Sequence, residues 1–370
     1  MPEIVLDGLV KRYGSCRAAD GLSLEIRDGE YLCILGPTGS GKTTCLRMIC
    51  GLTRPDGGRV LFDGRDATRD PVSARSATML SQSYSLFPPK TVHENVMFSP
   101  KIKEWPEEEA KQVVKSMIGM VHMESKAESY PRELSGGQQQ RTALARALAS
   151  DSEILLLDEP LRALDARLRL ELRKELRSMV KEMGLTAIHV THDQDEALEM
   201  ADRIAVIRGG RIIQVGTPMD VFRDPATPFV ANFVGRSNIF SGRKTGESGG
   251  ASEIEVSGAG GAVATVRARA SDIPIGGAAA VAVKIGATAM AGSGGDGPGY
   301  FPGKVARVLY EGATITVEAD TPFGAVSAKL PDRMYEDYSE GMEVSIGWRP
   351  EDASVFGTPP ERLEEELRLD

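Results

Sequence analysis

The fold is decided by residues 31–43, YLCILGPTGSGKT, where a nearly all-apolar run leads directly into a glycine-rich turn. The run at 31–35 is typical of a central strand that is covered on both faces. Residues 36–43 fit the pattern G-x-x-x-x-G-K-[ST] without exception. A helix is expected from Thr43 to Cys50, with Gly51 at its C-terminal cap. This order of strand, turn and helix predicts an α/β fold with a phosphate-binding loop.

The residue types of this loop each have a physical reason. Glycines let the backbone wrap around a phosphate with its N–H groups pointing inward, and the following helix presents its positive end to the anion. Lys42 supplies a cation for the β- and γ-phosphates, and the Thr43 hydroxyl is a ligand for Mg²⁺. The residues expected to hold the nucleotide are Gly36, Pro37, Thr38, Gly39, Ser40, Gly41, Lys42, Thr43 and Thr44.

Two carboxylates follow a second buried strand, at residues 154–160, ILLLDEP. Ligands of open parallel sheets bind at the carboxyl ends of strands. Asp158 is therefore expected to hold Mg²⁺, directly or through water. Glu159 is expected to take a proton from the attacking water, as a general base.

The rest of the N-terminal region completes an α/β domain. Residues 1–30 alternate between apolar and polar and predict a small antiparallel sheet. Residues 90–150 are mainly helical, and one of these helices opens with Pro106 and three acidic residues. Further predicted elements are a charged amphipathic helix at 167–183, a strand at 186–191 and a hairpin over 203–215.

The composition changes near Gly235 towards Gly and Ala, with short alternating stretches that predict an all-β module of small-barrel type. We expect a nucleotide-binding domain at 1–235 and a barrel domain at 236–370. Residues 291–299 are expected to form a flexible loop, and residues 361–370 a short charged helix. The expected barrel strands are 263–269, 279–285, 304–310, 314–318 and 343–348.

Composition limits the function classes. The 370 residues suffice for two or three folded units, and the formal net charge of −9 argues against a nucleic-acid partner. Cys33, Cys45 and Cys50 lie among apolar neighbours and are expected to be reduced core residues. The N-terminus lacks the features of a signal peptide, and no apolar run approaches the roughly 18 residues of a membrane span. The expectation is a cytoplasmic protein.

The segment at 134–141, LSGGQQQR, is more specific, because the phosphate loop alone indicates only an NTPase. It resembles the signature of the ABC ATPase family. Its first residues would open a helix whose positive end faces a phosphate. In that family the phosphate belongs to the ATP of the other subunit, so the resemblance implies a head-to-tail dimer with two sandwiched nucleotides. The residues implied to contact ATP in trans are Ser135, Gly136, Gly137, Gln138 and Asp165.

Other family landmarks follow in order. The resemblance implies that Tyr13 stacks on adenine and that Gln82 reaches Mg²⁺ and the attacking water. It also implies that His192 contacts the γ-phosphate. Lys42, Gln82, Glu159 and His192 are thus the expected catalytic residues, and the expected Mg²⁺ ligands are Thr43, Gln82 and Asp158. The implied fold is a RecA-like P-loop core with an antiparallel β subdomain and a helical subdomain at about 90–150.

One residue departs from the family pattern. The loop at 161–165 carries Arg162 where the family usually has a small Ser. Two placements are open for this side chain: it points to solvent, or it pairs with an acid across the dimer interface. His93, His122 and His189 match no family landmark and are expected to be structural or at the surface.

Two later segments extend the resemblance. Residues 229–240, FVANFVGRSNIF, resemble the linker of importer ATPases with a TOBE-type barrel, and residues 347–352, GWRPED, resemble a late motif of that barrel. The barrel is either a dimer-stabilising appendage or a regulatory binding site. The resemblance implies a peripheral ATPase at the cytoplasmic face of the membrane. Its implied partners are two permease subunits, a second ATPase that is identical or different, and, indirectly, an extracytoplasmic solute-binding protein.

The function implied is ATP hydrolysis that powers solute import. The solute is expected to be a polyamine, ferric iron, a phosphonate or a sugar, and the linker favours the first three over sugars. The alternatives are an exporter ATPase and a non-transport ABC ATPase. The barrel favours an importer by family analogy, and the chain shows neither paired ATPase domains nor a long coiled-coil insertion. A regulatory module with an inactive site is disfavoured by the intact Lys42, Asp158, Glu159, Gln138 and His192.

Overall fold

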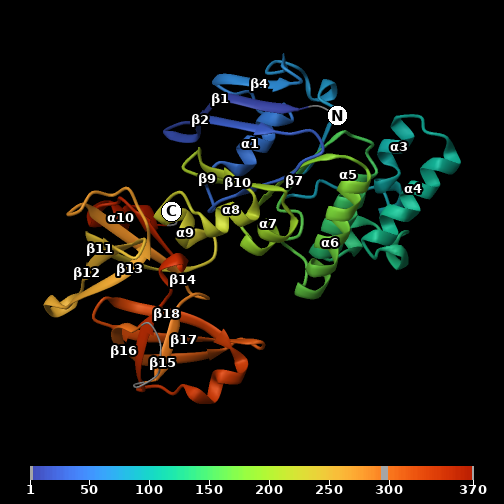
Figure 1. Cartoon of the computed structure of the whole chain (residues 1–370). Coiled ribbons are helices and arrows are strands. Elements are labelled where there is room, and N and C mark those ends of the chain that lie inside the picture. Colours follow the sequence, from blue (N-terminus) through green and yellow to red (C-terminus); the bar gives the residue numbers. More distant parts are fainter. Residues whose placement is uncertain (1–2, 293–298, 369–370) are drawn as a thin grey trace. The chain divides into compact units, whose positions relative to one another are not determined.

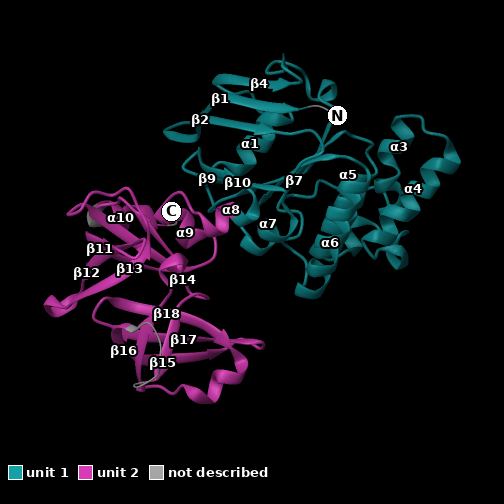
Figure 2. Ribbon diagram, viewed as in Figure 1, with its two compact units in different colours: residues 1–219, 370 teal, residues 220–369 magenta. Residues whose placement is uncertain are grey.

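The structure is a computed structural model that describes residues 3–292 and 299–368 (Figure 1). It divides into two compact units, Met1–Met219 with Asp370 and Asp220–Leu369 (Figure 2). The division lies earlier than the expected boundary after residue 235. Helix α9 (Pro228–Phe233) is held in the second unit, because the Lys284 ammonium donates hydrogen bonds to two carbonyls at its C-terminal end. Residues 293–298 of the expected flexible loop lie outside the described residues.

The first unit is built on a six-stranded sheet with the order β10-β9-β3-β8-β7-β6. Strand β3 (Tyr31–Leu35) is buried at every residue and pairs in parallel with β8 and β9, which confirms the predicted central strand. The predicted hairpin is also present, as antiparallel β9 and β10. The other strands are β6 (Ala77–Leu80), β7 (Ile154–Asp158), β8 (Thr186–Thr191), β9 (Arg203–Arg208) and β10 (Arg211–Gly216).

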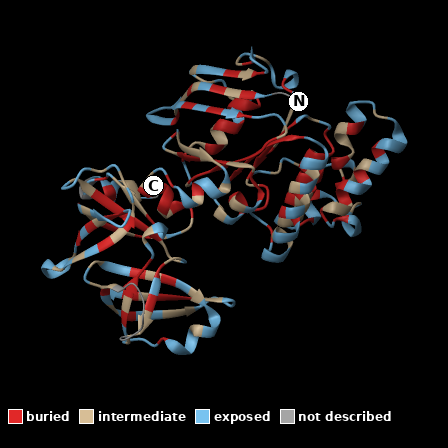
Figure 3. Cartoon of the chain, viewed as in Figure 1, coloured by how far each residue is buried: buried red, intermediate tan, exposed pale blue. Residues whose placement is uncertain are grey.

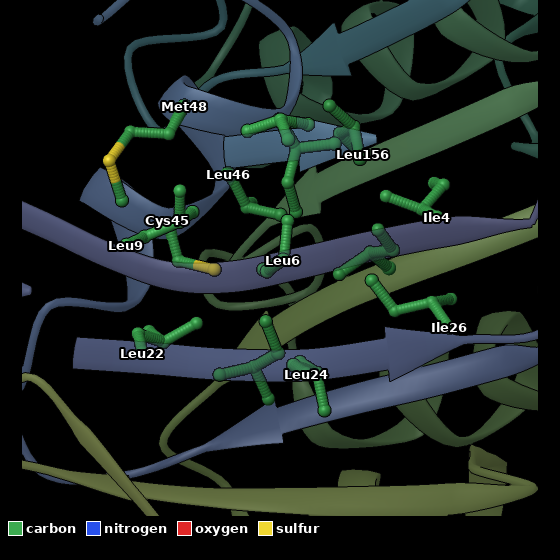
Figure 4. Packing of buried hydrophobic residues seen from close by; sticks show 14 of the residues in the cluster. Ile4, Leu6, Leu9, Leu22, Leu24, Ile26, Cys45, Leu46, Met48 and Leu156 are labelled. Atoms are coloured by element: carbon green, nitrogen blue, oxygen red, sulfur yellow. The ribbon is translucent and has the colours of Figure 1, made fainter. Parts of the chain in front are cut away.

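A second, antiparallel sheet has the order β2-β1-β4-β5, as expected for the N-terminal region. Helix α1 (Lys42–Ile49) packs between the two sheets, because Cys45, Leu46 and Met48 share one core with side chains of both (Figure 4). Burial raises the pKa of the Cys45 thiol to about 12, in agreement with a reduced core cysteine. The strands are β1 (Ile4–Tyr13), β2 (Cys16–Ile26), β4 (Gly57–Phe62) and β5 (Arg65–Asp66).

The remaining helices of the first unit include the predicted helical region. Gly51 lies two residues after the end of α1 and has a φ of +82°, which fits its predicted capping role. Helix α4 (Glu107–Met120) begins with the three predicted acidic residues, and α6 (Ala166–Glu182) is the predicted charged helix. The others are α2 (Val92–Val96), α3 (Phe98–Ile102), α5 (Gly136–Leu148) and α7 (Gln194–Met200), and α8 (Pro218–Arg223) contains the division between the units.

The second unit consists of two five-stranded antiparallel sheets, with the orders β13-β12-β11-β14-β20 and β15-β19-β16-β17-β18. Both contribute to one apolar core, in which Trp348 stacks on Phe240. Figure 3 shows this core as buried segments of the strands. The bounds are β11 (Ser237–Ser248), β12 (Ala251–Ser257), β13 (Val263–Arg269), β14 (Ala278–Lys284), β15 (Ala289–Gly292), β16 (Gly299–Tyr310), β17 (Thr314–Thr321), β18 (Gly324–Pro331), β19 (Glu343–Gly347), β20 (Ala353–Phe356) and helix α10 (Pro360–Leu367).

Candidate functional site

The phosphate loop runs from the end of β3 to the start of α1, as predicted. Two of its glycines are fixed by close backbone approach. A Cβ at Gly36 would lie 2.3 Å from the carbonyl oxygen of Ile207, and a Cβ at Gly41 would lie 2.1 Å from that of Ala18. Gly41 also has a φ of +103°, in the region that favours glycine. The loop conformation therefore depends on these two residues having no side chain.

Lys42 is buried inside this loop. Its ammonium donates hydrogen bonds to the carbonyl oxygens of Gly36, at 2.8 Å, and of Pro37, at 2.7 Å. Desolvation lowers the pKa of Lys42, and the nearby charges of Glu159 and Asp158 oppose that shift. Two neutral carbonyls contact this buried cation directly, and the two carboxylates act on it only through their charge. The ammonium therefore remains able to attract an anion within the loop.

Thr43 and Asp158 meet at the C-terminal end of β7. The Thr43 hydroxyl donates to Oδ1 of Asp158 at 3.0 Å. Oδ2 of Asp158 and the Ser40 hydroxyl are buried and have no hydrogen-bond partner within the described part of the chain. Desolvation raises the pKa of Asp158. An unpartnered buried carboxylate oxygen of Asp158, next to the Thr43 hydroxyl, fits the oxygen ligands that Mg²⁺ requires.

Glu159 lies one residue further along, with a φ of +51°. Its Oε1 is 2.8 Å from Nδ1 of His192. Its Oε2 accepts hydrogen bonds from Gln82 Nε2 at 3.3 Å and from Arg162 Nη1 at 2.7 Å. Burial alone would raise the pKa of Glu159, but the contacts with His192 and Arg162 outweigh it, so the pKa lies below its ordinary value. The carboxylate therefore stays ionised and able to accept a proton.

The sheet order explains why Gln82, Glu159 and His192 meet. They follow β6, β7 and β8, which are adjacent and parallel, so their carboxyl ends share one edge of the sheet. The structure thus brings together three of the four predicted catalytic residues by direct contact. Lys42 follows β3, the next strand along, and is electrostatically coupled to Glu159.

The signature segment occupies a different place in the first unit, at the N-terminus of α5. Ser135 caps this helix: its hydroxyl accepts from the Gln138 N–H at 3.3 Å, and the Gln138 side chain accepts from the Ser135 N–H at 2.9 Å. A Cβ at Gly137 would lie 2.9 Å from the carbonyl oxygen of Ala163, whereas Gly136 has open space. This end of the helix is therefore ordered by its own side chains.

Two more predicted residues lie at exposed element ends. Tyr13 ends β1, its side chain is half exposed, and the Lys11 ammonium lies 5.6 Å from its ring centre. Asp165 caps α6, where its carboxylate accepts from the Leu168 N–H at 3.0 Å. An exposed aromatic ring is available for stacking on a base, which fits the predicted role of Tyr13.

Sequence reasoning missed Gln140, which positions Glu159. Gln140 is buried in α5, its Nε2 donates to the carbonyl oxygen of Glu159 at 2.9 Å, and its Oε1 accepts from the Ala163 N–H at 2.9 Å. It therefore holds both ends of the turn after the predicted base. The sequence did carry a signal: Gln140 is spaced three to four residues from Ala143 and Leu144, so it falls on the apolar face of the helix.

His189, which was expected to be structural or at the surface, lies in the core. It is completely buried in β8, and its Nδ1 is 3.0 Å from the Tyr31 hydroxyl. Its Nε2 lies 3.5 Å from Oε2 of Glu196 in α7. His189 thus links strand β3 to the helix that follows His192.

Arg162 is 58% exposed, as expected for a side chain that reaches solvent, but it also has a partner that was not expected. Its guanidinium forms an ion pair with Glu159 of the same chain, at 2.7 Å between Nη1 and Oε2. The two residues lie three positions apart in the turn between β7 and α6. They also line a small cavity of about 80 Å³, whose other lining residues are Arg169, Thr191, His192, Asp193 and Glu196.

Comparisons with known families agree with this geometry. Residues 19–162 match the ABC transporter family, and residues 280–356 match the TOBE domain. The described residues contain no helix that is both long and apolar enough to cross a membrane.

Curated relatives carry import functions in their names. The spermidine/putrescine import ATP-binding protein PotA of Acidothermus cellulolyticus is 49% identical over 244 residues, which cover 65% of this chain and 64% of the relative. The sulfate/thiosulfate import ATP-binding protein CysA of Xylella fastidiosa is 46% identical over 259 residues, which cover 69% of this chain and 73% of the relative. The match thus spans slightly less than two thirds of the PotA relative's length.

A solved structure supports the fold of the first unit. The post-hydrolysis dimer of the ATP-binding cassette MJ0796, bound to ADP and Pi, has a TM-score of 0.54 and 31% sequence identity. The likeness covers 58% of this chain and 98% of that one. A second dimeric structure of the same cassette has the same TM-score and 33% identity.

Proposed function

The chain belongs to the family of ABC transporter ATP-binding subunits, and from this premise we propose that it hydrolyses ATP to power solute import through partner membrane subunits. The observation that carries the proposal is the convergence of Gln82, Glu159 and His192 at one edge of the sheet, beside the phosphate loop. Both the TOBE match and the import relatives favour import over export.

The chemistry follows from the placement of the chain's own residues. The loop amides and Lys42 hold the β- and γ-phosphates and offset the charge that spreads over them in the transition state. Glu159 takes a proton from the attacking water at its carboxylate, and His192 contacts the γ-phosphate. Mg²⁺, when held by Thr43, Asp158 and Gln82, supplies further positive charge to the phosphate oxygens.

The proposal includes a second ATPase subunit. In the isolated chain, Ser135 and Gln138 form hydrogen bonds with each other's backbone N–H groups. We propose that the nucleotide of the partner is contacted by Ser135, Gly136, Gly137, Gln138 and Asp165. The dimeric state of the MJ0796 cassette supports this arrangement, with a homodimer as the simplest form. Each site would then be complete only when two chains associate, so ATP favours the closed dimer.

The solute and partners are also part of the proposal. The relatives import polyamines in one case and sulfate or thiosulfate in the other, and these two solute classes are the first to test. The proposed partners are two permease subunits and, through them, a solute-binding protein, with this chain peripheral at the cytoplasmic face of the membrane. The barrel in the second unit is proposed to stabilise the dimer or to regulate it. Purification of the intact complex and identification of the bound solute-binding protein would determine the solute.

The central test is a Glu159→Gln variant of the full chain. We expect it to bind ATP, to dimerise stably and to release phosphate about 10²- to 10⁴-fold more slowly, which is the usual contribution of a general base. Phosphate release, nucleotide binding and dimer mass are measured on the same preparation. Near-normal turnover in this variant would remove Glu159 from the role of base.

A further inference from the structure

Arg162 occupies the carboxylate that the proposed reaction needs. Its Nη1 lies 2.7 Å from Oε2 of Glu159, the shortest of the three contacts that the structure shows at this carboxylate. Gln82 Nε2 lies at 3.3 Å from the same oxygen, and His192 Nδ1 at 2.8 Å from Oε1. A carboxylate offers about four lone-pair sites, two on each oxygen. With these contacts made, both sites of Oε2 are taken, and one site remains on Oε1 beside His192.

The three partners of Glu159 differ in what else they are proposed to do. Once nucleotide is bound, His192 is proposed to contact the γ-phosphate. Gln82 is proposed to contact Mg²⁺ and the attacking water. Arg162 has no such second partner within the site. It is therefore the donor expected to stay on the carboxylate when the nucleotide arrives.

The backbone of the turn that carries Arg162 is anchored, whereas the Arg162 side chain is largely exposed and has room to change its conformation. Gln140 anchors the turn through the Glu159 carbonyl and the Ala163 N–H, each at 2.9 Å. The Arg162 side chain is 58% exposed, and that of Glu159 is 13% exposed. The guanidinium can therefore swing into solvent without disturbing the backbone, whereas the carboxylate is held in place.

We propose that Arg162 restrains hydrolysis by occupying Oε2 of Glu159, and that turnover is faster when its guanidinium leaves this oxygen. This inference rests on the proposed function, in which Glu159 is the base. Arg162 is a positioning residue here, because it acts through Glu159 and touches no reacting atom.

The test compares the full chain with Arg162→Ser and Arg162→Lys, by phosphate release over a range of ATP concentrations. Arg162→Ser should raise kcat about two- to fivefold, the size of one exposed ion pair, and leave KM for ATP unchanged. Arg162→Lys should keep kcat at the wild-type value, because the lysine ammonium replaces the positive charge of the guanidinium. An unchanged or lower kcat in Arg162→Ser would overturn the inference.

A matched control separates this effect from the general loss of a surface ion pair. Arg59 pairs with Asp7 at 2.7 Å, and its side chain is 59% exposed, so the distance and the exposure of the arginine match those of Arg162. Its partner Asp7 is more exposed than Glu159, at 51% against 13%. Arg59→Ser should leave kcat unchanged, and an equal rise in this variant would contradict the proposal.

A second background separates this inference from the proposed function. In Glu159→Gln, the added Arg162→Ser change should give no rise in kcat, because the restrained carboxylate is absent. A rise of the same size there would overturn the restraint while leaving Glu159 as base. Full turnover by Glu159→Gln alone would instead overturn the proposed function.

Discussion

Two lysines, one in each unit, make the same kind of local contact but have different roles. Lys42 and Lys284 are each largely buried, and each ammonium donates hydrogen bonds to two backbone carbonyls. For Lys284 these are the carbonyls of Ala231 and Val234, both at 2.8 Å, at the C-terminal end of α9. Desolvation lowers the pKa of both lysines, and that of Lys284 falls to about 8.

Their surroundings differ. Asp158 and Glu159 lie close enough to Lys42 to oppose the shift of its pKa, and Oδ2 of Asp158 has no partner among the residues that the structure describes. Lys284 lies 4.8 Å from the ring centre of Phe222, and desolvation is the cause of its pKa shift. The buried ammonium of Lys42, beside carboxylates, can take part in binding a nucleotide. That of Lys284, which contacts carbonyls and an aromatic ring, holds helix α9 in place.

The largest expected effect comes from Lys42→Met, which tests the binding half of this comparison. The variant should lower kcat/KM for ATP about 10²- to 10³-fold, the usual cost of one transition-state donor. Phosphate release and equilibrium nucleotide binding measure the effect. Lys284→Met, which removes the corresponding group of the second unit, should retain turnover, and equal losses in both variants would break the distinction.

The next effect is a dependence of the free energy of unfolding on pH, caused by Lys284. Its pKa is near 10.5 in the unfolded chain and about 8 in the folded unit. Between these values the unfolded chain binds the additional proton, so the free energy of unfolding rises with pH, by at most about 3 kcal/mol. Lys284→Met should lack this rise.

The measurement is denaturant unfolding at several pH values from 7 to 10, followed by Trp348 fluorescence. The chain has two tryptophans, so a Trp105→Phe background assigns the signal to the buried Trp348 of the second unit. Parallel pH curves for the wild type and Lys284→Met would show that Lys284 stays charged in the folded unit.

The smallest effect concerns the signature segment, whose groups satisfy each other in the isolated chain. Ser135→Ala should lower the free energy of unfolding by about 1 kcal/mol, the usual value of a helix cap. It should also reduce turnover about tenfold, the size of one charge-assisted hydrogen bond to a phosphate.

Thr91 is the matched control, because it forms the same type of capping box with Glu94 at the start of α2. Thr91→Ala should cost similar stability in thermal or denaturant unfolding and leave turnover unchanged. Equal loss of turnover in both variants would indicate that Ser135 acts only as a cap.

The comparison of Lys42 with Lys284 also shows which site residues can be predicted from the sequence. Lys42, Asp158 and Glu159 were identified because local patterns, a buried strand followed by fixed residue types, determine their surroundings. Lys284 carried no such pattern: its role depends on α9, about 50 residues earlier in the chain. The pairing of Arg162 with Glu159 likewise depends on the turn that Gln140 closes, which sequence spacing does not determine.

The fold shows the same division. Strands with continuous or alternating apolar residues, such as β3 and β13, were predicted, and the overall fold class is confirmed. Strand β11 was missed because Gly242 and Gly246 interrupt its pattern. A Cβ at Gly242 would lie 2.2 Å from the carbonyl oxygen of Glu255, so the glycine is required by the close approach of β12. Such a requirement is tertiary and leaves no local signal.

The carbonyl of Ala18 has a consequence for how this chain can change. Its oxygen lies 2.1 Å from the position of a Cβ at Gly41 and 3.1 Å from that of a Cβ at Gly210. The Gly210 N–H donates to the Ser40 carbonyl at 3.0 Å. Strand β2, the phosphate loop and the β9–β10 turn therefore meet through bare backbone. Mutational tolerance should be low at these two glycines. A peptide tag inserted between Gly209 and Gly210 should weaken nucleotide binding, although it lies about 170 residues from Gly41 along the chain.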